Sequence, residues 1–259
     1  MHGLGNDYLY VYGDVPENIK ELSVRLSDRH FGAGSDGMIY ISPSSAADFK
    51  MRIFNADGSE AKMCGNGIRC VGKYVYDKGY TDRTELTVET LSGIRTLKLD
   101  VRCGKVRTVT VGMGKAAAEE DKILTIAGRQ VACTPVSVGN PHAVIFVEDA
   151  GCAEVSDLGP LIEKDRAFPG GANVEFVEVL SELRLRMRVW ERGSGITMAC
   201  GTGACAAVCA AVKKGFCHYN VPVEVLLDGG LLKIFIDPDG SVTMRGPAET
   251  VYEGETELC

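Results

Sequence analysis

Two cysteines at matched positions offer the clearest chemistry in this sequence. Cys64 and Cys200 stand in two similar segments, and each is followed by Gly-x-Gly. The residues upstream also correspond at the same interval along the chain, because Met51–Asn55 and Met187–Glu191 each begin with Met-Arg and continue with two apolar residues. A duplicated half with one thiol in each copy suggests two thiols facing each other across an internal two-fold axis. Such a pair can take a proton from one side of a carbon and return one from the other.

Each cysteine precedes the expected start of a helix. The first-turn amides of a helix lack intrahelical partners and the dipole there is positive, which favours a thiolate and can hold a carboxylate. We therefore expect the pKa of each cysteine to be lowered. Glycines at 65, 67, 201 and 203 allow a ligand to approach the backbone closely. One such motif would be more typical of a core cysteine at a helix cap, whereas two copies in register favour a function.

Other polar residues suit an amino-acid ligand. Asn55 and Glu191 precede their cysteines by the same interval, so they should occupy equivalent strand ends. Glu191 and Arg192 together suit a ligand that carries its own ammonium and carboxylate groups. His142 precedes an apolar run and, as the partner of a thiol, would raise its thiolate fraction. Taken singly, each of these residues more often has a structural role.

Composition argues against several other classes of function. The chain has 259 residues and a net charge of −7, and an acidic chain without a long basic run is a poor nucleic-acid binder. It shows no signal peptide and no apolar run long enough to span a bilayer, so we expect a cytoplasmic protein without a membrane partner. The ten cysteines show no zinc-site spacing. No phosphate loop, dinucleotide motif or pyridoxal phosphate site is recognisable, so we expect no cofactor.

Hydrophobic periodicity predicts the same order of elements in both halves. A central helix should follow each cysteine, over residues 67–78 and 203–214, and each is stopped by a glycine. The second is apolar nearly all round, which is typical of a helix buried on every side. Further helices are predicted at 16–27 and 157–166. Strands are predicted at 8–12, 38–41, 49–54, 85–89, 94–102, 105–111, 143–147, 175–179, 183–190, 223–227, 231–236 and 241–245.

These elements predict an α/β (α+β) fold with two pseudo-symmetric domains. Each domain should be a curved, mostly antiparallel sheet wrapped around one central helix. A small acidic stretch at 116–122 is the expected crossover. It divides the chain into a half at 1–117, which carries Cys64, and a half at 118–259, which carries Cys200. A C-terminal strand at 247–259 is expected to pack back on the first half.

Several long motifs, in order along the whole chain, resemble those of the diaminopimelate epimerase family. They are Met1–Tyr8, Phe54–Ser59, Met63–Cys70, Gly139–His142, Trp190–Gly193 and Ala199–Gly203. The resemblance implies a pair of pseudo-symmetric α/β domains and often a homodimer. It also implies cofactor-independent interconversion of LL- and meso-diaminopimelate, a small amino-acid substrate on the path to lysine and peptidoglycan.

The resemblance further implies roles for individual residues. Cys64 and Cys200 would be the acid/base pair, assisted by His142 and Glu191. The backbone at two helix starts would hold the α-carboxylate of the reacting centre, through Gly65, Asn66, Gly201 and Thr202. Side chains around the substrate would be those of Asn6, Asn55, Asn140, Asn173, Glu191 and Arg192. No metal ligand is implied.

Two positions depart from the family pattern. Ile196 stands where many members have glutamate, and Gly37 stands where some carry a polar residue. Two alternatives therefore remain beside diaminopimelate epimerisation. One is a racemase of another amino acid, such as histidine, on the same fold. The other is a non-catalytic or redox-responsive binding protein, which would not exchange the Cα hydrogen of a ligand with solvent.

Overall fold

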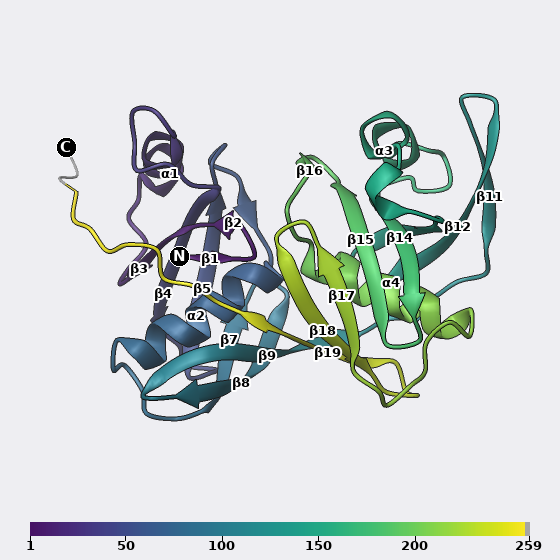
Figure 1. Cartoon of the computed structure of the whole chain (residues 1–259). Coiled ribbons are helices and arrows are strands. Elements are labelled where there is room, and N and C mark those ends of the chain that lie inside the picture. The colour runs from purple at the N-terminus through teal and green to yellow at the C-terminus, as the bar shows by residue number, and fades with distance from the viewer. Residues whose placement is uncertain (257–259) are drawn as a thin grey trace. The chain divides into compact units, whose positions relative to one another are not determined.

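The computed structural model describes residues 1–256, and its chain divides into two compact units (Figure 1). The N-terminal unit is Met1–Val111 together with the segment from Pro247 onward, and the C-terminal unit is Gly112–Gly246. The predicted crossover at 116–122 is partly structured instead, because strand β9 (Lys105–Lys115) runs up to it and Ala117–Ala118 forms β10. Beyond β19 (Ser241–Pro247), the described part of the chain forms an isolated antiparallel bridge between Glu249 and His2.

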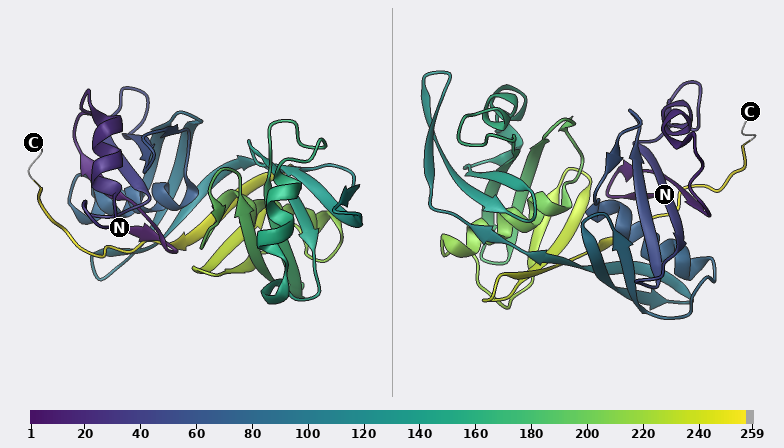
Figure 2. Two further views of the ribbon diagram at one scale, coloured as in Figure 1. Left: turned by 90° about the horizontal axis from the view of Figure 1, so that it is seen from above. Right: turned by 180° about the vertical axis from the view of Figure 1, so that it is seen from behind.

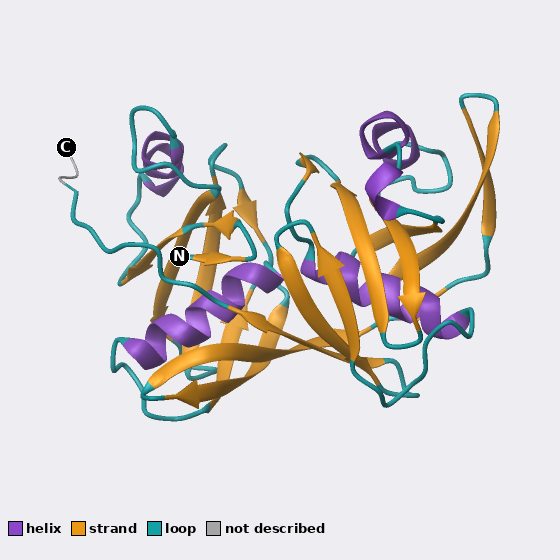
Figure 3. Ribbon diagram, viewed as in Figure 1, coloured by secondary structure: helices purple, strands orange, loops and turns teal. Residues whose placement is uncertain are grey.

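The described residues of the N-terminal unit form two helices, α1 (Ile19–Ser27) and α2 (Gly65–Asp77) (Figure 3). Its strands are β1 (His2–Gly3), β2 (Asn6–Asp7), β3 (Leu9–Tyr12), β4 (Gly37–Pro43), β5 (Phe49–Asn55), β6 (Glu60–Ala61), β7 (Glu85–Thr90), β8 (Gly93–Arg102) and β9. The pairs β3–β4 and β5–β7 are parallel, and β4–β5, β7–β8 and β8–β9 are antiparallel. The two-residue strands have no periodicity, so no sequence pattern predicts them.

Alternation along β4 separates the two helices of this unit. Met38 and Tyr40 belong to the apolar cluster that α1 covers, together with Leu22 and Phe54. The intervening Ile39 points the other way, toward the first turn of α2, because successive strand residues face opposite sides of a sheet. The two helices therefore lie against opposite faces of the strands. In the left view of Figure 2, α1 is the dark purple helix that covers one of these faces.

The C-terminal unit repeats this order. Its helices are the short η1 (Ala150–Cys152), α3 (Val155–Glu163) and α4 (Gly201–Lys213). Its strands are β10, β11 (Lys122–Ile126), β12 (Arg129–Ser137), β13 (Pro141–Phe146), β14 (Asn173–Ser181), β15 (Arg184–Glu191), β16 (Gly195–Ile196), β17 (Val223–Leu227), β18 (Gly230–Ile236) and β19 (Ser241–Pro247). The hairpin of β11 and β12 is absent from the sequence-based prediction, although Ala127 and Gly128 form its turn with positive φ angles.

The internal repeat is confirmed at the level of whole elements. The interval along the chain from α1 to α3 is the same as that from α2 to α4, and it equals the interval between the two cysteines. Strands β4 and β14 show the same offset, from Gly37 to Asn173. Pairing also corresponds, since β13–β14 and β15–β17 are parallel and β14–β15 is antiparallel. Two copies of one α/β plan therefore make up the chain, as predicted.

Helix α4 is the buried helix that the sequence predicts. Its residues from Ala204 to Ala207 are 0% exposed, and Ala210 and Ala211 are equally buried. Small side chains on every face let sheet strands approach the helix closely. Because the helix is buried on every side, its sequence is apolar on every face. Among residues 1–256, no helix is long and apolar enough to cross a membrane.

Candidate active site

Cys64 is the N-cap of α2, which begins at Gly65 rather than at the predicted residue 67. Its backbone is extended, with φ −134° and ψ 116°, and its Sγ accepts a hydrogen bond from the Gly67 amide at 3.3 Å. The thiol in turn lies 3.3 Å from Asn6 Oδ1. A sulfur that caps a helix faces the positive end of the dipole, where an anion is favoured. The structure thus brings the side chain of Asn6, a predicted substrate-binding residue, to the Cys64 thiol.

Acidic residues fix the position of Asn6. Its amide donates to Asp36 Oδ2 at 2.8 Å, and the same oxygen accepts from the Asp7 backbone amide at 3.1 Å. Arg29 forms ion pairs with both Asp7 and Asp36. Because a carboxylate only accepts hydrogen bonds, Asp36 holds the amide nitrogen of Asn6 and leaves its oxygen directed toward the Cys64 thiol.

Asn55 lies in a second network of the N-terminal unit. It accepts from the Tyr8 hydroxyl at 3.2 Å and donates to Ser59 Oγ at 3.0 Å. Gly37 sits beside it with φ +151°, and a Cβ there would lie 2.2 Å from the Phe54 carbonyl oxygen. Only glycine fits such a site. Glycine at position 37, which departs from the family pattern, is thus explained by the close approach of its backbone to that of Phe54 and Asn55.

Cys200 repeats the geometry of Cys64 at the start of α4. Its φ and ψ are −114° and 112°, and its Sγ accepts from the Gly203 amide at 3.4 Å. Thr202 Oγ1 lies 3.6 Å and Asn173 Nδ2 4.0 Å from the sulfur. Cys200 is only 4% exposed. Two cysteines with the same extended backbone and the same capping bond are the structural counterpart of the sequence repeat.

Carboxylates surround Cys200 and correct one expectation. Glu191, at the end of β15, accepts from Thr197 Oγ1 at 2.5 Å, and burial raises the pKa of its carboxyl despite that bond. Burial also raises the pKa of the Cys200 thiol well above its usual range, and the nearby Glu191 and Glu175 carboxylates raise it further. The predicted lowering is wrong for Cys200, because desolvation and negative charge outweigh the helix N-terminus.

His142 is completely buried and held at both ring nitrogens. Its Nδ1 lies 2.7 Å from Glu175 Oε1, and its Nε2 lies 3.1 Å from Asn140 Oδ1. In the parallel ladder His142 is the partner of Asn173, which faces the same side as Glu175 two residues on. Glu175 is absent from the residues that the sequence predicts. Its signal is a carboxylate two residues after Asn173 in the same strand, the spacing that places both side chains on one face.

Arg192 and Ile196 lie beyond the end of β15. The Arg192 backbone amide donates to Asn173 Oδ1 at 2.9 Å, and its guanidinium donates to the Gly170 carbonyl at 2.6 Å. Ile196 forms β16 with Gly195 and is 46% exposed. The C-terminal unit therefore gathers Asn140, His142, Asn173, Glu191, Arg192, Cys200 and Thr202, all of which are sequence-predicted site residues.

The helix starts also present backbone amides. In any α-helix the first N–H groups have no intrahelical acceptor. Gly65 and Asn66 occupy these positions in α2, and Gly201 and Thr202 occupy them in α4. Each start can therefore offer amides to an anion such as a carboxylate. Among residues 1–256, no group of three or more His, Cys, Asp or Glu side chains is placed to hold a metal ion.

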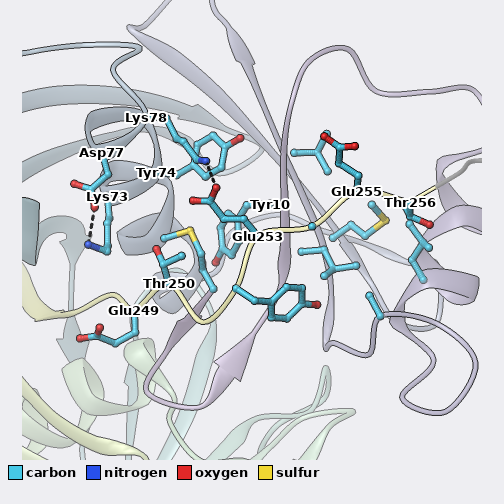
Figure 4. Close-up of a pocket in the computed structure, with 18 of the residues that line it drawn as sticks. Tyr10, Lys73, Tyr74, Asp77, Lys78, Glu249, Thr250, Glu253, Glu255 and Thr256 are labelled. Atoms are coloured by element: carbon cyan, nitrogen blue, oxygen red, sulfur yellow. Dashed lines mark hydrogen bonds and ion pairs between the residues drawn. The ribbon is translucent and has the colours of Figure 1, made fainter.

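A cavity of about 900 Å³ in the N-terminal unit contains none of these residues (Figure 4). It lies beneath the C-terminal segment, between Tyr10 on β3 and Tyr74 on α2. Lys78 reaches Glu253 of that segment at 2.6 Å, and Lys73 pairs with Asp77 at 2.7 Å. The cavity is thus a gap under the returning chain, separate from both cysteines.

Solved structures share the fold of this chain. A phenazine biosynthesis protein of the PhzF family from Bacillus anthracis matches with a TM-score of 0.79 at 16% identity, over 100% of this chain and 95% of that one. A probable proline racemase from Agrobacterium radiobacter matches with a TM-score of 0.77 at 17% identity, over 100% and 92%. At these identities the likeness concerns the fold, and it confirms the predicted fold class.

Sequence comparison is more specific. The family model for diaminopimelate epimerase matches residues 1–118 and 134–251. Diaminopimelate epimerase from Acetivibrio thermocellus is 47% identical, over 100% of this chain and 97% of its own. Those from Methanococcus maripaludis and Bacillus licheniformis are 47% and 48% identical, over 100% and 98% of this chain and 98% and 96% of their own lengths. The chain belongs to the diaminopimelate epimerase family, as its motifs predict.

Proposed function

We propose that this protein epimerises LL-2,6-diaminopimelate to meso-diaminopimelate, with Cys64 and Cys200 as the acid/base pair. Family membership over the full chain supports the reaction. The observation that carries the mechanism is the matched N-cap geometry of the two thiols, each accepting from the glycine amide three residues on. Inversion at a carbon needs one group to remove a proton and a second to deliver one from the opposite face.

The proton transfers follow from this pair. One cysteine, as the thiolate, takes the Cα proton and becomes a thiol. The electron pair left on Cα is delocalised into the α-carboxylate, whose oxygens are stabilised by the amides at the helix starts. The other cysteine, as the thiol, donates its proton to the opposite face and becomes the thiolate. The two roles are exchanged in the reverse reaction, so no other reactant is consumed.

Substrate choice is assigned to the polar groups away from the thiols. We assign the distal carboxylate to Asn55, Asn173 and Arg192, and the distal ammonium to Glu191. Polar groups that a bound ligand covers without pairing them are costly, so a site built for a distal amino-acid centre rejects ligands that lack one. Lysine, alanine and histidine should therefore be turned over orders of magnitude more slowly than LL-diaminopimelate.

The test compares Cys64→Ala and Cys200→Ala with the parent protein on this panel of amino acids. Each substitution should abolish epimerisation of LL-diaminopimelate while the protein still unfolds cooperatively. Cys103→Ala is the matched control, because Cys103 is an exposed cysteine in the turn between β8 and β9. Near-normal turnover by either catalytic variant would refute the pair. Comparable kcat/KM for histidine would refute the substrate.

A further inference from the structure

The repeat is broken at one buried position beneath each catalytic helix. Ile39 on β4 and Glu175 on β14 are each the third residue of equivalent strands. A Cβ built on Gly67 would lie 2.6 Å from Ile39 Cδ1, and one built on Gly203 would lie 2.7 Å from Glu175 Oε1. The same site under the first helical turn therefore holds a methyl group in one unit and a carboxylate in the other.

The fold itself does not require a carboxylate there, since isoleucine serves in the equivalent position. Glu175 is 0% exposed, and its Oε2 is buried with no hydrogen-bond partner among the described residues. Its Oε1 is 2.7 Å from His142 Nδ1. A carboxylate only accepts, so Nδ1 carries the hydrogen of this bond. Burying a carboxylate with one oxygen left unpaired is costly, which points to a use.

The charge lies close to one thiol. The Cβ position on Gly203 that is 2.7 Å from Glu175 Oε1 is also 3.2 Å from Cys200 Sγ, so the carboxylate and the sulfur border the same methyl-sized space. Within the C-terminal unit, the carboxylates that act on Cys200 are Glu175 on β14 and Glu191 at the end of β15, and His142 on β13 contacts Glu175. Two carboxylates outweigh one imidazole, and this balance disfavours a thiolate.

We infer that Glu175 is a positioning residue whose buried charge holds Cys200 in the thiol form in the free enzyme. Cys200 then enters the reaction as the proton donor. Ile39 gives Cys64 no equivalent charge, so Cys64 is the thiol of the pair that can serve as the base. The inference rests on the proposed function for its catalytic meaning, but its physical content concerns the free protein alone.

The experiment measures alkylation by iodoacetamide as a function of pH, with Cys64 and Cys200 resolved by peptide mass spectrometry. The midpoint is compared rather than the rate, because the two thiols differ in exposure. In the parent protein Cys200 should react with the higher midpoint. Glu175→Gln keeps an acceptor for His142 and removes the charge. It should lower the midpoint of Cys200 alkylation by about one pH unit or more. At pH values below the midpoints of both proteins, the rate of Cys200 alkylation should therefore rise about tenfold.

Controls separate this charge effect from general disturbance. Glu182→Gln removes an exposed carboxylate that lies 3.5 Å from His218, and it should leave both midpoints unchanged. Glu175→Ile copies the N-terminal unit and should act as Glu175→Gln does. A parent Cys200 midpoint at or below that of Cys64, or an unchanged Cys200 midpoint in the folded Glu175 variants, would overturn the inference. No substrate is present, so the result is independent of whether diaminopimelate is turned over.

Discussion

Gly203→Ala tests how tightly the first turn of α4 is built around its thiol. In an ordinary helix this substitution stabilises by about 1 kcal/mol, because glycine has the poorer helix propensity. Here the added Cβ would lie 2.7 Å from Glu175 Oε1 and 3.2 Å from Cys200 Sγ. Both atoms belong to buried groups, so neither can move into solvent.

The expected magnitude follows from these opposing effects. Overpacking a buried site costs about 1–3 kcal/mol, and the gain in propensity offsets about 1 kcal/mol of that. We expect a net loss of about 1 kcal/mol in the free energy of unfolding, because the overpacking term is the larger. Displacement of the thiol should lower kcat by much more, since misplacement by about 1 Å costs about 100-fold in rate.

Urea unfolding and steady-state epimerisation measure the two effects separately. The matched control is Gly72→Ala in α2, whose Cβ would lie 2.9 Å from methyl groups of Leu97 and Leu99. It should cost stability in the same way while leaving kcat of the folded protein near normal. A Gly203→Ala variant that is more stable than the parent and fully active would refute this account of the site.

Two further predictions concern the stability of the N-terminal unit and the binding of the substrate. Asp48 accepts from the Thr87 amide and hydroxyl, both at 2.7 Å, and these bonds with the Arg83 guanidinium lower the pKa of its carboxyl. Asp48→Asn should therefore lower the free energy of unfolding by about 1 kcal/mol at neutral pH. Because the pKa of Asp48 is lower in the folded state, its carboxylate stabilises the fold above the unfolded-state pKa, and this stability is lost as pH falls through the folded-state pKa. In urea unfolding near pH 2, the parent and Asp48→Asn proteins should therefore have the same free energy of unfolding. Arg192→Lys should raise KM for LL-diaminopimelate at least tenfold with a smaller change in kcat, because an ammonium cannot reproduce bidentate binding of a carboxylate. An unchanged KM would remove Arg192 from the substrate site.

The repeat explains why so much of this fold could be predicted from sequence. Matched cysteines fix two helix starts, and the apolar run after Cys200 identifies the buried helix α4. The sequence does not predict the hairpin of β11 and β12, because Ala127-Gly128 is a weaker turn signal than Asn-Gly, although it adopts the same left-handed angles. Its strands also have no counterpart in the first half that could have drawn attention to them.

The electrostatics of the site could not be predicted in the same way. A helix N-terminus is visible in the sequence, whereas the burial of Cys200 and the approach of Glu175 depend on strands brought together only by folding. Those contacts reverse the expected direction of the Cys200 pKa. Glu175 shares its strand with a second glutamate, Glu178, and only the spacing of Glu175 from Asn173 places it on the face of the site.

The most direct test of the central claim follows hydrogen at Cα during the first turnovers in heavy water. If two different thiols act on opposite faces, meso-diaminopimelate formed from the LL isomer should carry solvent deuterium at the inverted carbon, while the remaining LL substrate stays unlabelled. Product that retains the original hydrogen would contradict the mechanism, because it would mean that one group removes and returns the same proton.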